Sequence, residues 1–128
     1  TIQILLTGLA FKGKPRTNDW RNSPSIELGR FLDSKGFEMF GWDSLISSRV
    51  IKENWLKDFS LLSQIPEVVI LANNSDDNLN FLMTELNTSK NKLEIIGDPW
   101  NMLRENEMFN QVISRGISVV TISKSFHG

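Results

Sequence analysis

Short apolar runs that recur between helix-like segments constrain the fold of this chain more than any other feature. Residues 2–6 and 68–72 are rich in leucine and β-branched side chains, and each run stops at a polar or glycine-containing turn. Such runs are typical of strands that are buried on both faces of a sheet. Residues 37–42, 93–96 and 117–122 have a similar strand-like composition. We therefore expect about five strands.

The segment that follows residue 22 carries strong signals for a helix. Ser23 has a side-chain oxygen that can cap the first backbone N–H groups, and Pro24 suits the first helical position. The helix is expected to run to about Lys35, because Gly36 can then adopt the left-handed conformation that commonly ends helices.

Two further helices are expected around residues 79–86 and 102–115, and the mixed apolar spacing of residues 43–64 fits one or two short helices. Strands and helices therefore alternate along the chain. This order across short loops predicts a single α/β domain with a Rossmann-like fold of three layers, in which helices cover both faces of a parallel sheet.

Composition excludes several classes of protein. The 128 residues suit one domain, and the net charge of -1 gives no overall attraction to nucleic acid or to an anionic membrane. The chain has no cysteine and one histidine, so it can build neither a disulfide framework nor a thiolate zinc site. No apolar run approaches the roughly 20 residues of a membrane-spanning helix. We expect a cytoplasmic protein, and the start at Thr1 suggests a segment of a longer one.

The loop after the first strand is the most unusual part of the chain. Ligands of doubly wound sheets bind beyond the carboxyl ends of the strands, where this loop lies. It holds four basic side chains and one acidic side chain, so it is either a seat for phosphate at the start of a helix or a solvated basic loop. These residues are Lys12, Lys14, Arg16, Arg21 and Asp19.

Three known nucleotide or phosphate motifs fail in this loop. Residues 8–14 have the spacing of a P-loop, but Pro15 follows where a magnesium-binding Ser or Thr is required. Ala10 stands where the G-x-G-x-x-G dinucleotide fingerprint needs its second glycine. The first strand ends in Thr7 and Gly8, so it also lacks the acidic pair of a phosphoacceptor receiver domain.

The residues of this loop match a known family. Residues 8–13, GLAFKG, and 17–25, TNDWRNSPS, resemble the start of the C-terminal, UDP-binding domain of the UDP-glucose/GDP-mannose dehydrogenase family. The family pattern is G-L-A-F-K, a short spacer and T-D-D-x-R-E-S-P, and this chain has Asn18 and Asn22 in place of an Asp and the Glu.

The resemblance covers essentially the whole chain. Residues 40–43, FGWD, resemble an aromatic family strand that ends in Asp, and residues 69–74, VILANN, resemble the Asn-Asn-His of one subgroup. Ser75 replaces that His. Residues 95–101, IIGDPWN, resemble the strand and turn of the same subgroup, without the arginine that many members carry there.

The resemblance implies two sets of binding residues. The family places a Phe-Lys pair at the nucleotide sugar and the arginine of its R-x-S segment at NAD, which implies that Arg21 reaches that cofactor. The alternatives are that Phe11 is core, that Lys12 is merely solvated and that Arg21 forms a salt bridge at the helix start. On the substrate side we assign Phe11, Lys12, Gly13, Asn73 and Trp100.

The resemblance also sets what the segment can do. The family oxidises the sugar C6 alcohol twice with NAD, through a cysteine, to a uronic acid used as a polysaccharide precursor. This chain has no cysteine, so it is not catalytic alone. We expect Asp19, Asp43 and Asp98 to cap turns rather than act as bases.

The predicted function is therefore a UDP-sugar binding domain. Its expected partners are the UDP-sugar and the N-terminal NAD-binding and central helical domains of the same protein, in a homodimeric enzyme; nucleic acid and membrane are not expected partners. The alternative is a non-catalytic α/β interaction or regulatory domain that kept the scaffold, which the replacements Asn18, Asn22 and Ser75 favour.

Overall fold

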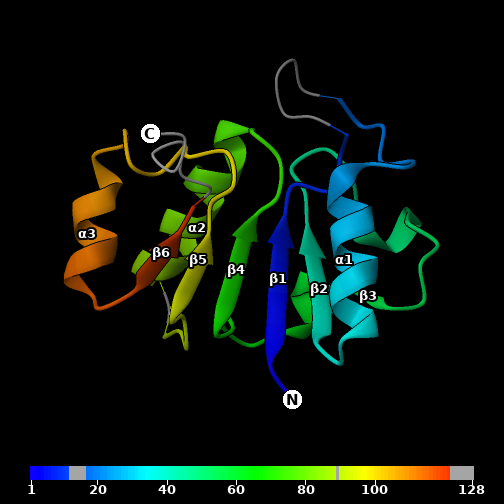
Figure 1. Cartoon of the computed structure of the whole chain (residues 1–128), viewed down its shortest axis with the longest axis horizontal. Helices are drawn as coiled ribbons and strands as arrows, with labels where there is room; N and C mark the ends of the chain where they lie inside the picture. The colour runs from blue at the N-terminus through cyan, green and yellow to red at the C-terminus, as the bar shows by residue number, and fades with distance from the viewer. Residues whose placement is uncertain (12–16, 89, 122–128) are drawn as a thin grey trace, which may run out of the picture.

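A parallel sheet forms the centre of the molecule (Figure 1). The computed structural model describes residues 1–11, 17–88 and 90–121, and within these residues six strands pair in the order β3-β2-β1-β4-β5-β6. All five pairings are parallel. The strands are β1 (Gln3–Thr7), β2 (Glu38–Trp42), β3 (Leu56–Asp58), β4 (Val68–Leu71), β5 (Ile95–Gly97) and β6 (Ser118–Val120). This order is that of a doubly wound Rossmann sheet.

Helices cover both faces of the sheet, which confirms the predicted fold class. Figure 1 shows α1 (Pro24–Ser34) in front of the half of the sheet that holds β1 and β2, whereas α2 (Asp76–Thr88) lies behind the half that holds β4, β5 and β6. The third helix is α3 (Met108–Ser114). The alternating side chains of the strands therefore divide into two cores. Leu6 packs with Ile26 of α1 in one core, and Leu5 packs with Leu82 of α2 in the other.

The first helix begins and ends where its sequence predicts. Ser23 Oγ accepts a hydrogen bond from the Ile26 N–H at 3.1 Å, and Pro24 follows as the first helical residue. Lys35 is the C-terminal cap, and Gly36 has a φ of +94°, the left-handed conformation expected of it. These signals act within one turn of helix, so no distant contact is needed to place the helix.

Residues 43–64 differ from the prediction. They contain two short 3₁₀ helices, η1 (Ser48–Val50) and η2 (Phe59–Leu61), and also the edge strand β3, so the sheet has one strand more than the expected five or so. The sequence Leu-Lys-Asp of β3 lacks an apolar run because an edge strand is covered less than a central one.

The last third of the chain also shifts relative to the prediction. Helix α3 starts at Met108 rather than near residue 102, because the Asp98 carboxylate accepts the backbone N–H groups of Met102 and Leu103 and holds residues 98–103 in a turn. Strand β6 ends at Val120, and residue 122 of the expected strand lies outside the described residues. No helix in the described part of the chain is long and apolar enough to cross a membrane.

Hydrogen bonds to Asp58 hold the edge strand β3 to the segment that precedes it. The Asp58 carboxylate accepts the hydroxyl of Ser48 in η1 and both the hydroxyl and the N–H of Ser60 in η2. Partial burial raises the pKa of Asp58, but the hydrogen bonds from Ser48 and Ser60 outweigh it and lower the pKa below the usual 3.8. Asp58 is thus ionised at neutral pH, as these donors require.

Gly29 provides a first test of the packing between α1 and the segment around residue 55. A Cβ at Gly29 would lie 2.5 Å from two ring atoms of Trp55. Gly29→Ala should therefore lower the free energy of unfolding by roughly 1–3 kcal/mol through overpacking, although Ala normally favours an exposed helix by about 1 kcal/mol. Urea titration measures the change. In a Trp55→Phe background, which removes these ring atoms and leaves Leu6 Cδ1 2.9 Å from the added Cβ, the same substitution should cost less, and an equal cost would refute this packing.

Candidate functional site

The carboxyl edge of the sheet holds the site where ligands of this fold bind. Strands β1 and β4 are neighbours, and the chain leaves them toward opposite faces, which opens a crevice between the two loops that follow. The loop after β1 contains residues 8–11, and the loop after β4 contains residues 72–75. Figure 1 shows both loops at the same edge, with the turn that follows β5.

Asp43, directly after β2, fixes the loop after β1. Its Oδ2 accepts the N–H of Leu9 at 2.7 Å and that of Ala10 at 3.0 Å. Its Oδ1 accepts the N–H of Leu45 at 2.8 Å and that of Ile46 at 3.2 Å, so both oxygens bind backbone. The prediction that Asp43 orders turns is confirmed.

The fixed turn does not fit the pyrophosphate of a dinucleotide. In a dinucleotide-binding domain, the backbone N–H groups of this first turn are available to the ligand. Here Asp43 binds the N–H groups of Leu9 and Ala10. The missing glycine fingerprint and this geometry therefore agree that the first turn is not that of a dinucleotide-binding domain.

Asn73 and Asn78 fill the crevice between the two loops. Asn73 is only 3% exposed, and its amide donates to the Ala10 carbonyl at 3.3 Å. Asn78 Nδ2 in turn donates to the Asn73 Oδ1 at 2.8 Å, and the Ser75 N–H donates to the same oxygen at 3.2 Å. Sequence reasoning assigned Asn73 to the substrate and missed Asn78, whose only signal is a polar residue on the apolar side of a helix. In the structure Asn73 joins the two loops.

The start of α1 supplies a third anchor for the same loop. Ser23 Oγ donates to the Leu9 carbonyl at 2.9 Å while it caps the helix. Ser25 Oγ donates to the Ala72 carbonyl at 3.2 Å, and Trp100 Nε1 donates to that carbonyl at 3.3 Å. The ends of β1, β4 and β5 and the start of α1 are therefore joined by side chains that sequence reasoning did not connect, apart from the helix cap.

The predicted binding residues separate into exposed and buried ones. Phe11 is 50% exposed and Trp100 is 49% exposed, so the alternative in which Phe11 is a core residue is wrong. Lys12 and Gly13 lie outside the described residues. Arg21 is exposed, and its Nε lies 3.3 Å from Asp19 Oδ1. This contact is the salt bridge near the helix start that the sequence analysis gave as the alternative to binding NAD.

The remaining predicted acidic residues act on backbone. Asp98 is 1% exposed, and its two oxygens accept the N–H groups of Met102 and Leu103. Asp19 Oδ1 accepts the Arg21 N–H at 3.2 Å. Both therefore order turns, as predicted. Among the residues that the structure describes, no group of three or more possible metal-binding side chains occurs.

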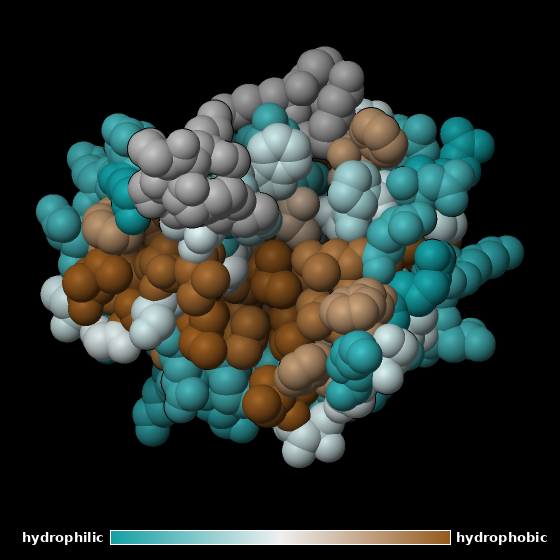
Figure 2. Space-filling model, viewed as in Figure 1, coloured by the Kyte–Doolittle hydropathy of each residue, from teal (hydrophilic) through white to brown (hydrophobic). Residues whose placement is uncertain are grey.

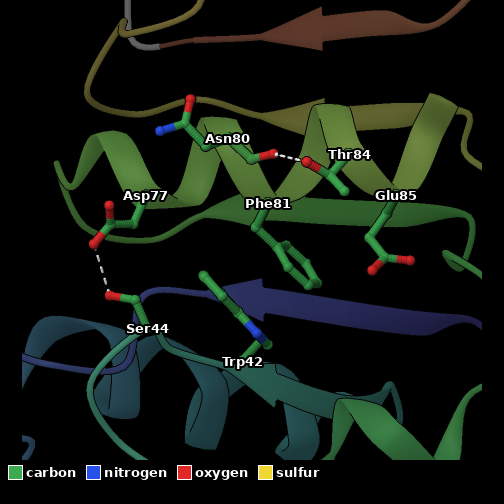
Figure 3. Close-up of a pocket in the computed structure, with 7 residues that line it drawn as sticks. All are labelled: Trp42, Ser44, Asp77, Asn80, Phe81, Thr84 and Glu85. Carbon is green, nitrogen blue, oxygen red and sulfur yellow. Dashed lines mark hydrogen bonds between the residues drawn. The ribbon is translucent and has the colours of Figure 1, made fainter. Parts of the chain in front are cut away.

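Apart from the crevice between the two loops, a hollow lies on the face of the sheet opposite to α1, beside the end of β2 (Figure 3). It is a shallow, open hollow of about 400 Å³ between the end of β2 and α2, and Trp42 stacks on Phe81 in it with ring centroids 4.0 Å apart. Ser44 Oγ donates to Asp77 at 2.8 Å at one end, and Glu85 lies at the other. The hollow lies apart from the predicted binding residues, and its aromatic stack joins α2 to β2.

The fold and this edge define a Rossmann-like α/β domain in which side chains from other segments of the domain fix the loop after β1. No family model matches the chain. The chain is 30% identical over 123 residues to the GDP-mannose 6-dehydrogenases of Pseudomonas savastanoi pv. phaseolicola and Pseudomonas syringae pv. tomato. The match covers 83% of the chain but only 27% of each relative, so the chain spans about a quarter of their length. This homology relates it to part of a nucleotide-sugar dehydrogenase.

Gly8 tests how closely the two loops approach. Its φ is +89°, and a Cβ would lie 2.4 Å from Asn73 Oδ1 and 2.7 Å from Asn78 Nδ2. Gly8→Ala should lose about 1–2 kcal/mol of stability to the left-handed backbone and roughly 1–3 kcal/mol more to the contact. Gly36→Ala is the matched control, because Gly36 is also left-handed but has nothing within 4 Å of its Cβ. Equal losses in thermal unfolding would contradict the close approach.

Asp43 tests the anchoring of the loop. Asp43→Asn turns one accepting oxygen into an N–H donor that faces backbone N–H groups, so it should lower the free energy of unfolding by about 1–3 kcal/mol. Asp33→Asn, at an exposed position of α1, should change it by less than about 0.5 kcal/mol. Denaturant titration of the two variants gives the comparison. An Asp43→Asn protein as stable as Asp33→Asn would show that the loop does not depend on this carboxylate.

Proposed function

We propose that this chain is the nucleotide-sugar binding domain of an NAD-dependent nucleotide-sugar 6-dehydrogenase, with a UDP-sugar as substrate. The observation that carries the proposal is the loop of residues 8–11, the G-L-A-F of the family pattern, which Asp43, Asn73 and Ser23 fix at the edge of the sheet where this fold binds ligands. The homology to part of GDP-mannose 6-dehydrogenase supports the same class of enzyme.

The ligand would lie along the outer side of the fixed loops. Phe11 and Trp100 each leave about half of their surface exposed at this edge, and an exposed aromatic ring can stack on a base or pack against a sugar. Lys12 follows Phe11 directly, and its ammonium suits the diphosphate. In this proposal Asn73 acts as a positioning residue, because its amide holds Ala10, the residue before Phe11.

The chain supplies binding rather than oxidation. NAD accepts hydride in such enzymes, and the aldehyde step needs a thiolate that this cysteine-free chain does not have. We propose that NAD-binding and helical domains of the same polypeptide, in a cytoplasmic homodimer, complete the site. Arg21 is 78% exposed in its side chain and is therefore free to reach the cofactor from its loop if its pair with Asp19 opens.

The binding residues can be separated by calorimetry with UDP-glucose. The isolated chain should bind it weakly, since one wall of the site must offset a loss of translational freedom of at least ~4 kcal/mol. Lys12→Ala should raise Kd about tenfold or more, since a charge-assisted hydrogen bond contributes roughly 1.5–3 kcal/mol. Arg21→Ala should leave Kd nearly unchanged and instead raise the apparent constant for NAD in the complete enzyme.

Three outcomes would change the proposal. Equal losses for Lys12→Ala and Arg21→Ala that fade above about 0.1 M salt would indicate a merely electrostatic loop. Tighter binding of GDP-mannose than of UDP-glucose would show that the nucleotide is guanosine rather than uridine diphosphate, as in the name of the Pseudomonas relatives. An absence of heat with either ligand at millimolar concentration would favour the interaction or regulatory domain.

A further inference from the structure

Half of one sheet face is apolar and partly exposed (Figure 2). The view of Figure 2 is that of Figure 1, and hydrophobic atoms gather over β4, β5 and β6 beside α1. Val120 is 59% exposed, and Ile95 is 39% exposed. Strand register places on this face Val68, Ile70, Ile95, Gly97, Ser118 and Val120, which we call the open face.

The open face conflicts with the rule that parallel sheets are covered on both sides. On the far side, the core contains side chains of α2 and α3 together with Val69 and Ile96. On the near side, α1 packs on β1 and β2 through Ile26, and the half-buried Val68 and Ile70 of β4 pack against the margin of the same core. In the ranges 1–11, 17–88 and 90–121, no helix lies over the open face (Figure 1).

The dimensions of the open face suit one helix. Two strand spacings of about 4.8 Å separate β4 from β6, which gives roughly 10 Å. Packed helices lie about 8–10 Å apart, so a second helix beside α1 would fill this width. Gly97 lies in the middle of the face with no side chain, and the side chain of Ile70 lies beside it, since a Cβ at Gly97 would be 3.3 Å from Ile70 Cγ1.

The side of α1 next to the open face is also apolar. Arg30 pairs with Glu53, in the segment between β2 and β3, so this flank of α1 points away from β4. The opposite flank carries Leu28 and Leu32, which are half-buried, and Phe31, which is exposed. The open face and this flank together form two walls of one groove.

We infer that the open face docks one amphipathic helix from another part of the same polypeptide. The inference rests on the proposal that the chain is one domain of a longer dehydrogenase, because the Pseudomonas relatives have nearly three quarters of their length outside the matched part. A second copy fits less well. The outer side of α1 stands above the sheet and exposes Glu27 and Ser34, and their burial in an apolar groove would be costly.

Cysteine labelling tests the docked helix, since this chain has no cysteine of its own. Val120→Cys places a thiol on the open face, and Val50→Cys is the matched control, because Val50 is 56% exposed and lies in η1. Both variants are made in the polypeptide encoded by the complete reading frame. Maleimide labelling is read by peptide mass spectrometry, in native buffer and in urea. The thiol at position 120 should react at least tenfold more slowly in native buffer than the thiol at position 50, and both should react alike in urea.

Several results would overturn the inference. Equal labelling rates at positions 120 and 50 in native buffer would do so, and so would a reading frame that encodes only these 128 residues. If the thiol at position 120 of the 128-residue chain becomes more protected from maleimide as the protein concentration rises, the occupant is a second copy. Ile95→Cys replaces Val120→Cys if circular dichroism shows that the latter does not fold. Nucleotide calorimetry on the same protein separates the two proposals, because protection without UDP-glucose or GDP-mannose binding would support the docked helix and refute the proposed function.

Discussion

The carboxylate of Asp43 fixes the loop on which the candidate site depends. Backbone N–H groups at the first turn of a Rossmann-like sheet need an acceptor, and in dinucleotide-binding domains the ligand's phosphates provide it. In this protein an internal anion takes that place, since Asp43 accepts the N–H groups of Leu9 and Ala10. The turn is therefore ordered by the chain itself, and in the proposed function the side chains that follow Ala10 recognise the ligand.

This arrangement explains why several polar residues at the site are buried. Asn73, Asn78 and Ser23 use their hydrogen bonds on backbone or on one another, and each links segments that are distant in sequence or caps a helix. A rigid support of this kind lets a ligand bind without a cost for ordering the loop. Phe11 and Trp100 remain exposed at its rim, where contact with a ligand is possible.

The parts of the fold that could be predicted are those set by local signals. Ser23, Pro24 and Gly36 bound α1 within one turn at each end, and the apolar run of β4 needs no partner to be recognised. The strand β3 and the late start of α3 could not be predicted, because an edge pairing and the contacts of Asp98 decide them. The candidate binding residues were assigned by resemblance rather than by spacing, and the hydrogen bond of Asn73 could not be predicted because its partner Ala10 is 63 residues away.

The pairing of β1 with β4 has a consequence for the order in which the protein folds. These central strands are separated by more than sixty residues, so closing the loop between them costs chain entropy before any of their contacts form. Folds dominated by such distant pairings fold slowly. During synthesis, β1, α1 and β2 leave the ribosome before β4, which completes the middle of the sheet. The loop that carries Phe11 therefore acquires its Asn73 anchor only in this late step.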